Sequence, residues 1–262
     1  MKCDLYWSIR RLARLTGFYT HRPDALSRQL RNIPKTLSRK QAALCLFPNV
    51  SRALVNHMEE HLHQNTDFWI ELNESYAKRR HRRPLVRSVH RFLYLTVRLM
   101  QPRLVIETGV FDGVSSAFIL RALEDNCYGR LISIDLPASL AILDSTVWML
   151  DSRLPEGCEP GWVIPTTLRK RHQLLLGDSK ELLPSVIQQL EIEVFFHDSL
   201  HTEEHMSFEY NTVWPRLSSG GVLISDDIHH SRAFEEFCSQ TKDARMLSTL
   251  GNFGAIRKDA RK

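Results

Sequence analysis

The chain has 262 residues, of which 43% are hydrophobic and 25% are charged, so it is long enough to bury the core of at least one globular domain. No segment approaches the roughly 20 uncharged apolar residues of a membrane-spanning helix, and the first residues lack the apolar run and cleavage site of a secretion signal, so we expect a cytoplasmic protein. Its five cysteines are scattered, and none is at Cys-x-x-Cys spacing, which argues against a disulfide framework or a cysteine-rich zinc site.

The charges are divided unevenly along the chain. Residues 1–100 contain 19 Lys and Arg against 7 Asp and Glu, whereas residues 101–262 contain 16 against 23. The first hundred residues show helical periodicity without strand alternation, and prolines interrupt it at several points. We therefore predict a basic helical extension over residues 1–84, followed by a second domain over residues 85–262.

Two basic segments of this extension leave its partner open. The run AKRRHRRPLVR (77–87) could hold RNA phosphates, but no aromatic residue interrupts it to stack on bases, so nucleic acid is the less favoured partner. The stretch LYWSIRRLARLTGF (5–18) is basic and amphipathic, and could contact anionic lipid, a second subunit or the domain that follows. We expect the extension to cover a substrate pocket or to form the interface of a homo-oligomer.

After Pro102 the pattern changes to short apolar runs separated by segments of helix length. The runs are LVIET (104–108), LISID (131–135), HQLLLG (172–177), EVFFHD (193–198), GVLISD (221–226), RMLSTLG (245–251) and NFGAIRK (252–258). Such alternation is typical of a parallel sheet with helices on both faces, and the last two runs, which meet at Gly251 and Asn252, predict a hairpin. The fold class is therefore α/β, a doubly wound Rossmann-like sheet of seven strands with the last one antiparallel.

One connection is longer than its position requires. About 36 residues separate the second and third predicted strands, and the part LPEGCEPGWVIP is loop-like by its Gly and Pro content. Long ordered loops are often functional, so we interpret it as a lid over a site, with Trp162 as an aromatic wall. The alternative is a surface excursion anchored by one buried tryptophan.

The turn after the first predicted strand has the features of a ligand site. It carries Gly109 and Gly113, and a helix follows from about Ser115. In a parallel α/β sheet this turn lies at the carboxyl edge, where ligands bind. The spacing is not the Gly-x-Gly-x-x-Gly of dinucleotide sites, and Glu107 at the strand end would repel a pyrophosphate, which disfavours a nicotinamide-dependent oxidoreductase.

A cationic ligand fits this turn better, and S-adenosylmethionine is such a ligand because its amino and sulfonium groups are positive. Asp135 ends the second predicted strand, where its carboxylate could bind the vicinal diol of a ribose. Asp178 and Ser179 follow the third predicted strand, where the adenine would lie. We therefore predict a cofactor site formed by Glu107, Gly109, Gly113, Ser115, Asp135, Asp178 and Ser179.

The series ETGVFDGVSS, ISID, LLGDSKELLP, FFHDSLHTEEH and LSSGGVLISDDI, over about residues 85–258, resembles the class I S-adenosylmethionine-dependent methyltransferases. Within them it is similar to the O-methyltransferase-like group that includes catechol-type and antibiotic-sugar enzymes. The resemblance implies the strand order 3-2-1-4-5-7-6 and methyl transfer to a hydroxyl of a small molecule. A catalytically silent member that only binds the cofactor remains an alternative.

The reacting end of the site is predicted at the fourth and fifth strands, which are neighbours in that order. Asp198 ends the fourth strand, and Asp226 and Asp227 end the fifth, so three carboxylates should lie close enough to repel unless a cation neutralises them. The catechol-type enzymes hold a divalent ion with acids at these positions, which implies Mg²⁺ here. His201, near Asp198, is the expected general base.

Two other interpretations of these residues are alternatives to the Mg²⁺ site. Asp227 or Ser231 could be the N-cap of the following helix. His201 and His205 are four residues apart, so with Asp198 they could also bind zinc, although oxygen ligands favour a harder ion.

Overall fold

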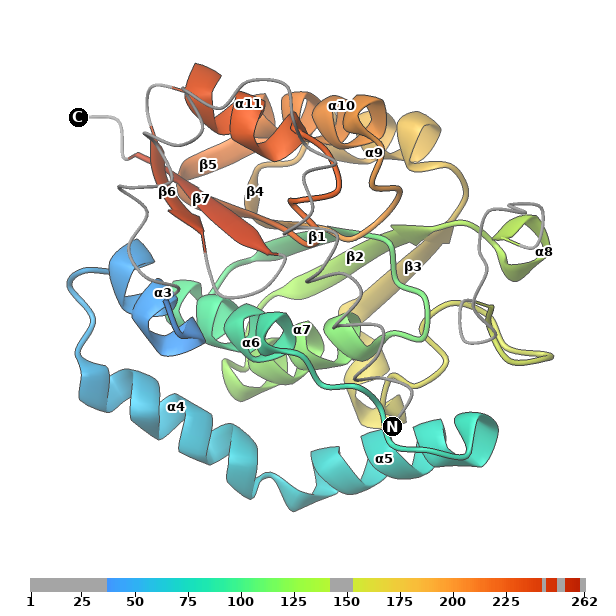
Figure 1. Cartoon of the computed structure of the whole chain (residues 1–262). Helices are drawn as coiled ribbons and strands as arrows, with labels where there is room; N and C mark the ends of the chain where they lie inside the picture. Colours follow the sequence, from blue (N-terminus) through green and yellow to red (C-terminus); the bar gives the residue numbers. More distant parts are fainter. Residues whose placement is uncertain (1–36, 142–152, 242–243, 249–252, 260–262) are drawn as a thin grey trace, which may run out of the picture. The chain divides into compact units, whose positions relative to one another are not determined.

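The sheet described by this computed structural model has seven strands in the order β3-β2-β1-β4-β5-β7-β6 (Figure 1). The structure describes residues 37–141, 153–241, 244–248 and 253–259. The amphipathic stretch 5–18, part of the predicted lid and the turn at Gly251 and Asn252 lie outside these residues. The strands are β1 (Leu104–Thr108), β2 (Arg130–Asp135), β3 (His172–Leu176), β4 (Ile192–His197), β5 (Leu217–Ser225), β6 (Ala244–Ser248) and β7 (Gly254–Lys258). The predicted strands and the implied order are both confirmed.

Strands β1 to β5 run parallel, and β7 is antiparallel to both β5 and β6. The last strand is therefore antiparallel, as the sequence predicted. The register aligns Thr108 with Ile134 on one side and with His197 on the other, and His197 with Ser225. Because the tips of β1, β2, β4 and β5 end in one row, the next residue of each strand reaches the same edge.

Helices cover both faces of the sheet, because the strands are apolar on both sides. On one face lie α6 (Ser88–Met100) and α7 (Val114–Asp125), and on the other lie α9 (Ser179–Ile187), α10 (Glu203–Val213) and α11 (Ala233–Gln240) (Figure 1). Alternate strand residues divide between the two hydrophobic clusters: Val105 and Phe196 pack towards α6 and α7, whereas Ile106 and Phe195 pack towards α9 to α11. This alternation produces the doubly wound arrangement.

Between Leu37 and α6 the structure describes three more helices, namely α3 (Arg39–Leu46), α4 (Arg52–Gln64) and α5 (Thr66–Arg80). Each begins at a side chain that caps free backbone N–H groups: Ser38, Ser51 and Asn65 accept from the residue three positions later. Their apolar faces belong to the same buried cluster as α6 and α7. The helices predicted from periodicity are thus present from Leu37 on. None of the described helices is both long and apolar enough to cross a bilayer.

The long connection between β2 and β3 contains the short helix α8 (Ala138–Ala141) and the 3₁₀ helix η2 (Thr166–Arg171). Trp162 in this connection stacks on Tyr76 of α5 at 5.6 Å between ring centroids, and its Nε1 donates to Asp112 at 2.8 Å. Arg80 of α5 forms an ion pair with the same carboxylate at 2.8 Å. The indole therefore joins the loop to α5 and to the turn after β1.

Candidate active site

The turn after β1 requires glycine at two positions because the chain passes close to itself there. Gly109 has φ of +81°, and a Cβ built on it would lie 2.1 Å from the carbonyl oxygen of Asp198. Gly113 has φ of +94°, and its Cβ would lie 2.6 Å from the Cα of Gly161. Any side chain would force these segments apart, so the glycines let the tips of β1 and β4 and the long loop meet.

Asp135, at the end of β2, holds this turn in place. Its Oδ2 accepts from the backbone N–H groups of Val110 at 2.9 Å and Phe111 at 2.7 Å, and its Oδ1 accepts from Leu136 at 2.8 Å. Burial raises the pKa of Asp135 above its usual value, although these hydrogen bonds act in the opposite direction. The carboxylate lies next to the glycine turn, as the ribose-binding prediction requires.

Glu107 is completely buried beneath the same turn. Its carboxylate accepts hydrogen bonds from the hydroxyls of Ser115 at 2.6 Å, Ser116 at 2.5 Å and Ser133 at 2.8 Å. Burial raises the pKa of Glu107 to about 7, against the effect of the three hydroxyls. Ser115 was expected among the cofactor contacts, but here its hydroxyl bonds to Glu107.

Asp178 and Ser179 have other partners than the glycine turn. Asp178 is the N-cap of α9, and its side chain accepts from the backbone N–H of Lys180 at 2.8 Å. Ser179 is buried and donates to Glu209 Oε1 at 2.6 Å. The preceding Gly177 donates its N–H to the carbonyl of Asp135 at 2.8 Å, so this segment does adjoin the turn through its backbone.

The acids at the ends of β4 and β5 meet, and a cation lies between them. Arg87 Nη2 is 2.6 Å from Asp226 Oδ2 and 3.6 Å from Asp198 Oδ2. Asp226 is 2% exposed, and Asp198 is partly buried. Burial and the neighbouring Asp226 raise the pKa of Asp198 well above its usual value, and Arg87 opposes this effect. The adjacent Asp227 also raises the pKa of Asp198, and its Oδ2 lies 3.6 Å from His230 Nε2.

His201 lies beside this acid pair. Its Nε2 is 3.7 Å from Asp198 Oδ1, and that nitrogen is buried without a hydrogen-bond partner. Burial lowers the pKa of His201 to about 4, so the imidazole is neutral near pH 7 and can accept a proton. Its ring contacts those of His197 and His230, with centroid separations of 5.4 and 5.5 Å.

The arrangement differs from the expected Mg²⁺ site. A magnesium ion requires carboxylate oxygens at about 2.0–2.1 Å. The guanidinium of Arg87 lies 2.6 Å from one Asp226 oxygen and 3.6 Å from one Asp198 oxygen, so a positive charge already lies beside both acids and would repel an ion bound between them. In the described part of the chain, no three His, Cys, Asp or Glu side chains are grouped to hold an ion. As described, these residues do not fit a divalent metal.

The residues of the zinc-site and helix-capping alternatives also have other partners in the structure. His205 Nε2 lies 2.9 Å from Glu209 Oε1, so its ring is engaged away from the acid pair. The N-cap residue of α11 is Arg232, whereas Ser231 Oγ accepts from the backbone N–H of Ala233 at 3.2 Å. Asp227 precedes that helix and does not cap it.

Sequence reasoning did not single out Glu209, which is fully buried on α10. Thr108 at 2.5 Å and His197 at 2.7 Å contact one of its carboxylate oxygens. The other meets Ser179, Ser199 and His205 at 2.6–2.9 Å. Burial alone would raise the pKa of Glu209, but these hydrogen bonds hold it well below the usual value. Glu209 is thus a buried anion that links the tips of β1 and β4 to α9.

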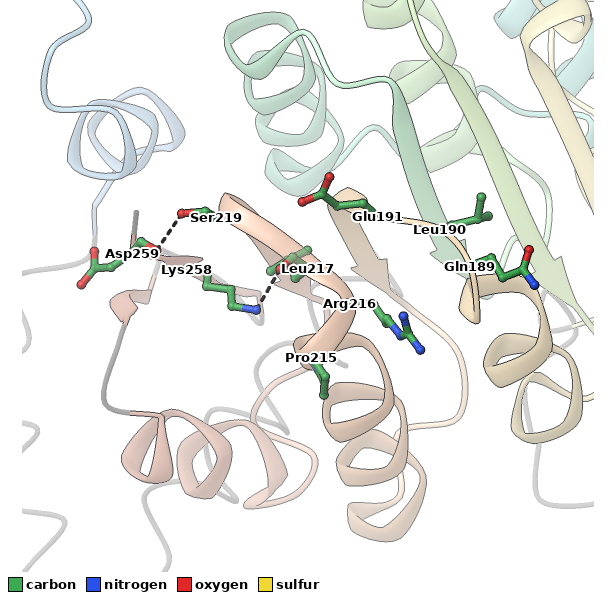
Figure 2. A pocket seen from close by; sticks show the side chains of 9 residues that line it. All are labelled: Gln189, Leu190, Glu191, Pro215, Arg216, Leu217, Ser219, Lys258 and Asp259. Carbon is green, nitrogen blue, oxygen red and sulfur yellow. Dashed lines mark hydrogen bonds between the residues drawn. The ribbon is translucent and has the colours of Figure 1, made fainter. Parts of the chain in front are cut away.

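An open groove of about 480 Å³ lies at the opposite edge of the sheet (Figure 2). It is lined by Gln189, Leu190, Glu191, Pro215, Arg216, Leu217, Ser219, Lys258 and Asp259. These residues lie before β4, around the start of β5 and at the end of β7. The groove is therefore at the amino-terminal edge of the parallel strands, away from the residues described above.

The comparisons with known proteins agree with this fold. The family described as a methyltransferase domain matches residues 106–228. An O-methyltransferase from Bacillus cereus, in complex with S-adenosylhomocysteine, is 16% identical with a TM-score of 0.54, and the match covers 79% of this chain and 97% of that one. No curated protein matches the sequence significantly.

Two further solved structures are similar. One is the O-methyltransferase TomG from Streptomyces achromogenes, involved in tomaymycin synthesis, in complex with S-adenosylmethionine: 17% identity, TM-score 0.53, covering 74% of this chain and 90% of that one. The other is a methyltransferase from Geobacter sulfurreducens: 19% identity, TM-score 0.52, covering 81% and 98%. At these identities the likeness concerns the fold.

Proposed function

We propose that the chain is a class I methyltransferase that transfers the methyl group of S-adenosylmethionine to a hydroxyl of a small molecule; the match to a methyltransferase domain over residues 106–228 and the strand order support this. One observation carries this proposal. The register of four neighbouring strands brings Gly109, Asp135, Asp198 and Asp226 to a single edge of the sheet, immediately after the aligned strand tips. A donor subsite and an acceptor subsite would then be adjacent.

On the donor side, the glycine turn gives a ligand access to the backbone, and Asp135 and Glu107 supply negative charge near it. Asp135 can accept from a ribose diol, although its oxygens also hold Val110 and Phe111. Glu107 lies deeper, and a positive ligand above the turn would favour its ionised form. Gly113, Ser115, Asp178 and Ser179 would support this subsite indirectly, through the turn, through Glu107 and through α9.

On the acceptor side, Asp198 and His201 would orient and deprotonate the hydroxyl. The bound donor supplies a methyl group on a positive sulfur, which is already a good leaving group, so the protein must align the acceptor and remove its proton. His201 has a neutral imidazole and an unused Nε2, as a general base requires. Asp198 Oδ1 lies 3.7 Å from this nitrogen, so its carboxyl group is near enough to bind the same acceptor hydroxyl.

Calorimetric titration with S-adenosylhomocysteine tests the donor half. We expect binding by the wild type, an affinity at least about tenfold lower for Asp135→Asn, and no change for Asp67→Asn, which alters an exposed acid in the first turn of α5. Equal affinity of the wild type and Asp135→Asn would contradict the assignment of Asp135. No binding by the wild type would refute the proposed function.

Mass spectrometry after incubation with S-adenosylmethionine and a panel of phenols, catechols and hydroxylated sugars tests the acceptor half. Addition of one methyl group to a hydroxyl is expected, and its rate should fall steeply in His201→Ala. Transfer to RNA that weakens with salt would identify the nucleic-acid alternative instead. Cofactor binding with no transfer to any acceptor would identify a silent binding module.

A further inference from the structure

The positive charge beside Asp198 and Asp226, at the proposed acceptor subsite, is the guanidinium of Arg87. Arg87 is the N-cap residue of α6, at the end of the segment that joins α5 to α6. Its backbone N–H donates to His90 Nδ1 at 3.1 Å. Burial lowers the pKa of His90 to about 3, so this nitrogen stays unprotonated and available as an acceptor near neutral pH. The backbone of Arg87 is thereby fixed before its side chain extends to the strand tips.

The guanidinium is the positive charge closest to the acid pair among the described residues. It is within 4 Å of both Asp226 and Asp198, and Asp227 adds a further favourable interaction with it. Asp226 is almost fully buried, and a buried carboxylate is unfavourable unless it is paired. Removal of Arg87 would therefore leave two carboxylates facing each other with no counter-charge.

A guanidinium and a divalent ion cannot both occupy this position. Arg87 Nη2 lies 2.6 Å from Asp226 Oδ2 and 3.6 Å from Asp198 Oδ2, and it would repel a second cation placed between the same two carboxylates. An arginine side chain has five N–H donors and stays charged at any physiological pH. The Arg87 side chain is 39% exposed, so part of it can be reached from solvent.

From this geometry, and resting on the proposed methyl transfer, we propose that Arg87 takes the place of a divalent ion at the acceptor site. Its charge offsets part of the negative charge of the acid pair, and its other N–H donors position the acceptor oxygen and stabilise that oxygen as its proton passes to His201. Arg87 is thus a positioning residue, and the reaction needs no divalent metal. If Arg87 is removed, the acid pair becomes free to bind such an ion.

Manganese binding tests this proposal without donor or acceptor. Mn²⁺ is titrated into the wild type, Arg87→Ala and Arg83→Ala, with binding followed by the electron paramagnetic resonance signal of the free ion. Arg83 is exposed in the same segment, which makes its variant a control for loss of one positive charge. We expect no saturable binding by the wild type or Arg83→Ala, and an affinity higher by about tenfold or more for Arg87→Ala. The further change Asp226→Asn should abolish the gained binding.

Methyl transfer provides the second readout. The wild-type rate should be unchanged after treatment with a chelator, Arg87→Ala should lose kcat more than it raises KM, and added guanidinium or Mn²⁺ should restore part of the loss. Saturable Mn²⁺ binding by the wild type that depends on Asp226, or a rate abolished by the chelator, would overturn the proposal. No gain of binding in a folded Arg87→Ala would overturn it equally. The Mn²⁺ result stands even if S-adenosylhomocysteine fails to bind, so the two proposals fail separately.

If Arg87→Ala does not fold, the same Mn²⁺ titration and rate measurement on Arg87→Lys test the proposal. A lysine keeps the charge but loses the planar fork, so it should keep Mn²⁺ out while lowering kcat. Saturable Mn²⁺ binding by Arg87→Lys would contradict the proposal.

Discussion

Glu107 should lower the stability of the protein as the pH rises, because the fold buries a carboxyl group that must ionise. Its pKa is raised from 4.5 to about 7, with burial as the main cause. Between these two values the native state binds more protons than the unfolded state, so the free energy of unfolding falls as the pH rises through this window and stays lower above it. At about 1.4 kcal/mol per pKa unit, the loss is about 3 kcal/mol at pH 8.

The variant Glu107→Gln removes this ionisation while keeping the size of the side chain. The hydroxyls of Ser115, Ser116 and Ser133 can rotate to accept from the amide, so the local packing should survive. We expect the variant to be more stable than the wild type at pH 8 by up to about 3 kcal/mol, with little difference at pH 4.5. It should also bind S-adenosylhomocysteine more weakly, because a negative charge near the ligand's amino group is lost.

Urea unfolding followed by circular dichroism at several pH values measures the effect. The control is Glu156→Gln, which changes an exposed glutamate in the long loop and should follow the wild-type curve. Other groups titrate in the same window, so the quantity of interest is the difference between wild type and variant. Parallel pH curves for the wild type and Glu107→Gln would refute the reasoning that Glu107 is held largely protonated in the native state.

Three further substitutions test the site through stability. Gly109→Ala should cost far more than Gly157→Ala, since both have positive φ but only Gly109 lacks space for a Cβ; equal urea midpoints would contradict the close approach of β1 and β4. Trp162→Phe should lower the free energy of unfolding, measured by calorimetry, by about 1 kcal/mol, because it loses the hydrogen bond to Asp112 but keeps an aromatic ring. An unchanged Tm would mean that this hydrogen bond does not stabilise the protein. Glu209→Gln should lower the free energy of unfolding by about 3 kcal/mol or more at pH 7. This cost should shrink as the pH falls below about 4.5, because the lowered pKa of Glu209 means that its stabilising contribution is lost progressively there. The same cost at every pH in urea unfolding would argue against a buried anion.

The strands and their order could be predicted because local patterns encode them. A strand buried on both faces is mostly apolar, and the runs LVIET and EVFFH, which are separated by segments of helix length, fit this pattern. Two strand-end acids, Asp198 and Asp226, could also be predicted to meet, since parallel neighbours end at the same edge. The structure brings these two together.

The partners of those acids could not be predicted in the same way. Arg87 belongs to the basic run AKRRHRRPLVR, and nothing in this run distinguishes it from Arg83. Glu209 lies on a helix whose sequence gives no sign that one glutamate is buried. Ser115 and Ser179 were predicted to contact the cofactor, and in the structure their hydroxyls bond to Glu107 and Glu209.

The sequence by itself determined the alternation of strands and helices, the glycine turn and the acids at the strand tips, because these depend on burial and backbone conformation along a short stretch of chain. Only the tertiary structure decided which charge neutralises the acid pair. That outcome depends on how α6 packs against the sheet, since only this packing brings the guanidinium of Arg87 within 4 Å of carboxylates far away in the sequence. Coulomb interactions act through space, so a pattern of neighbouring residues cannot specify them.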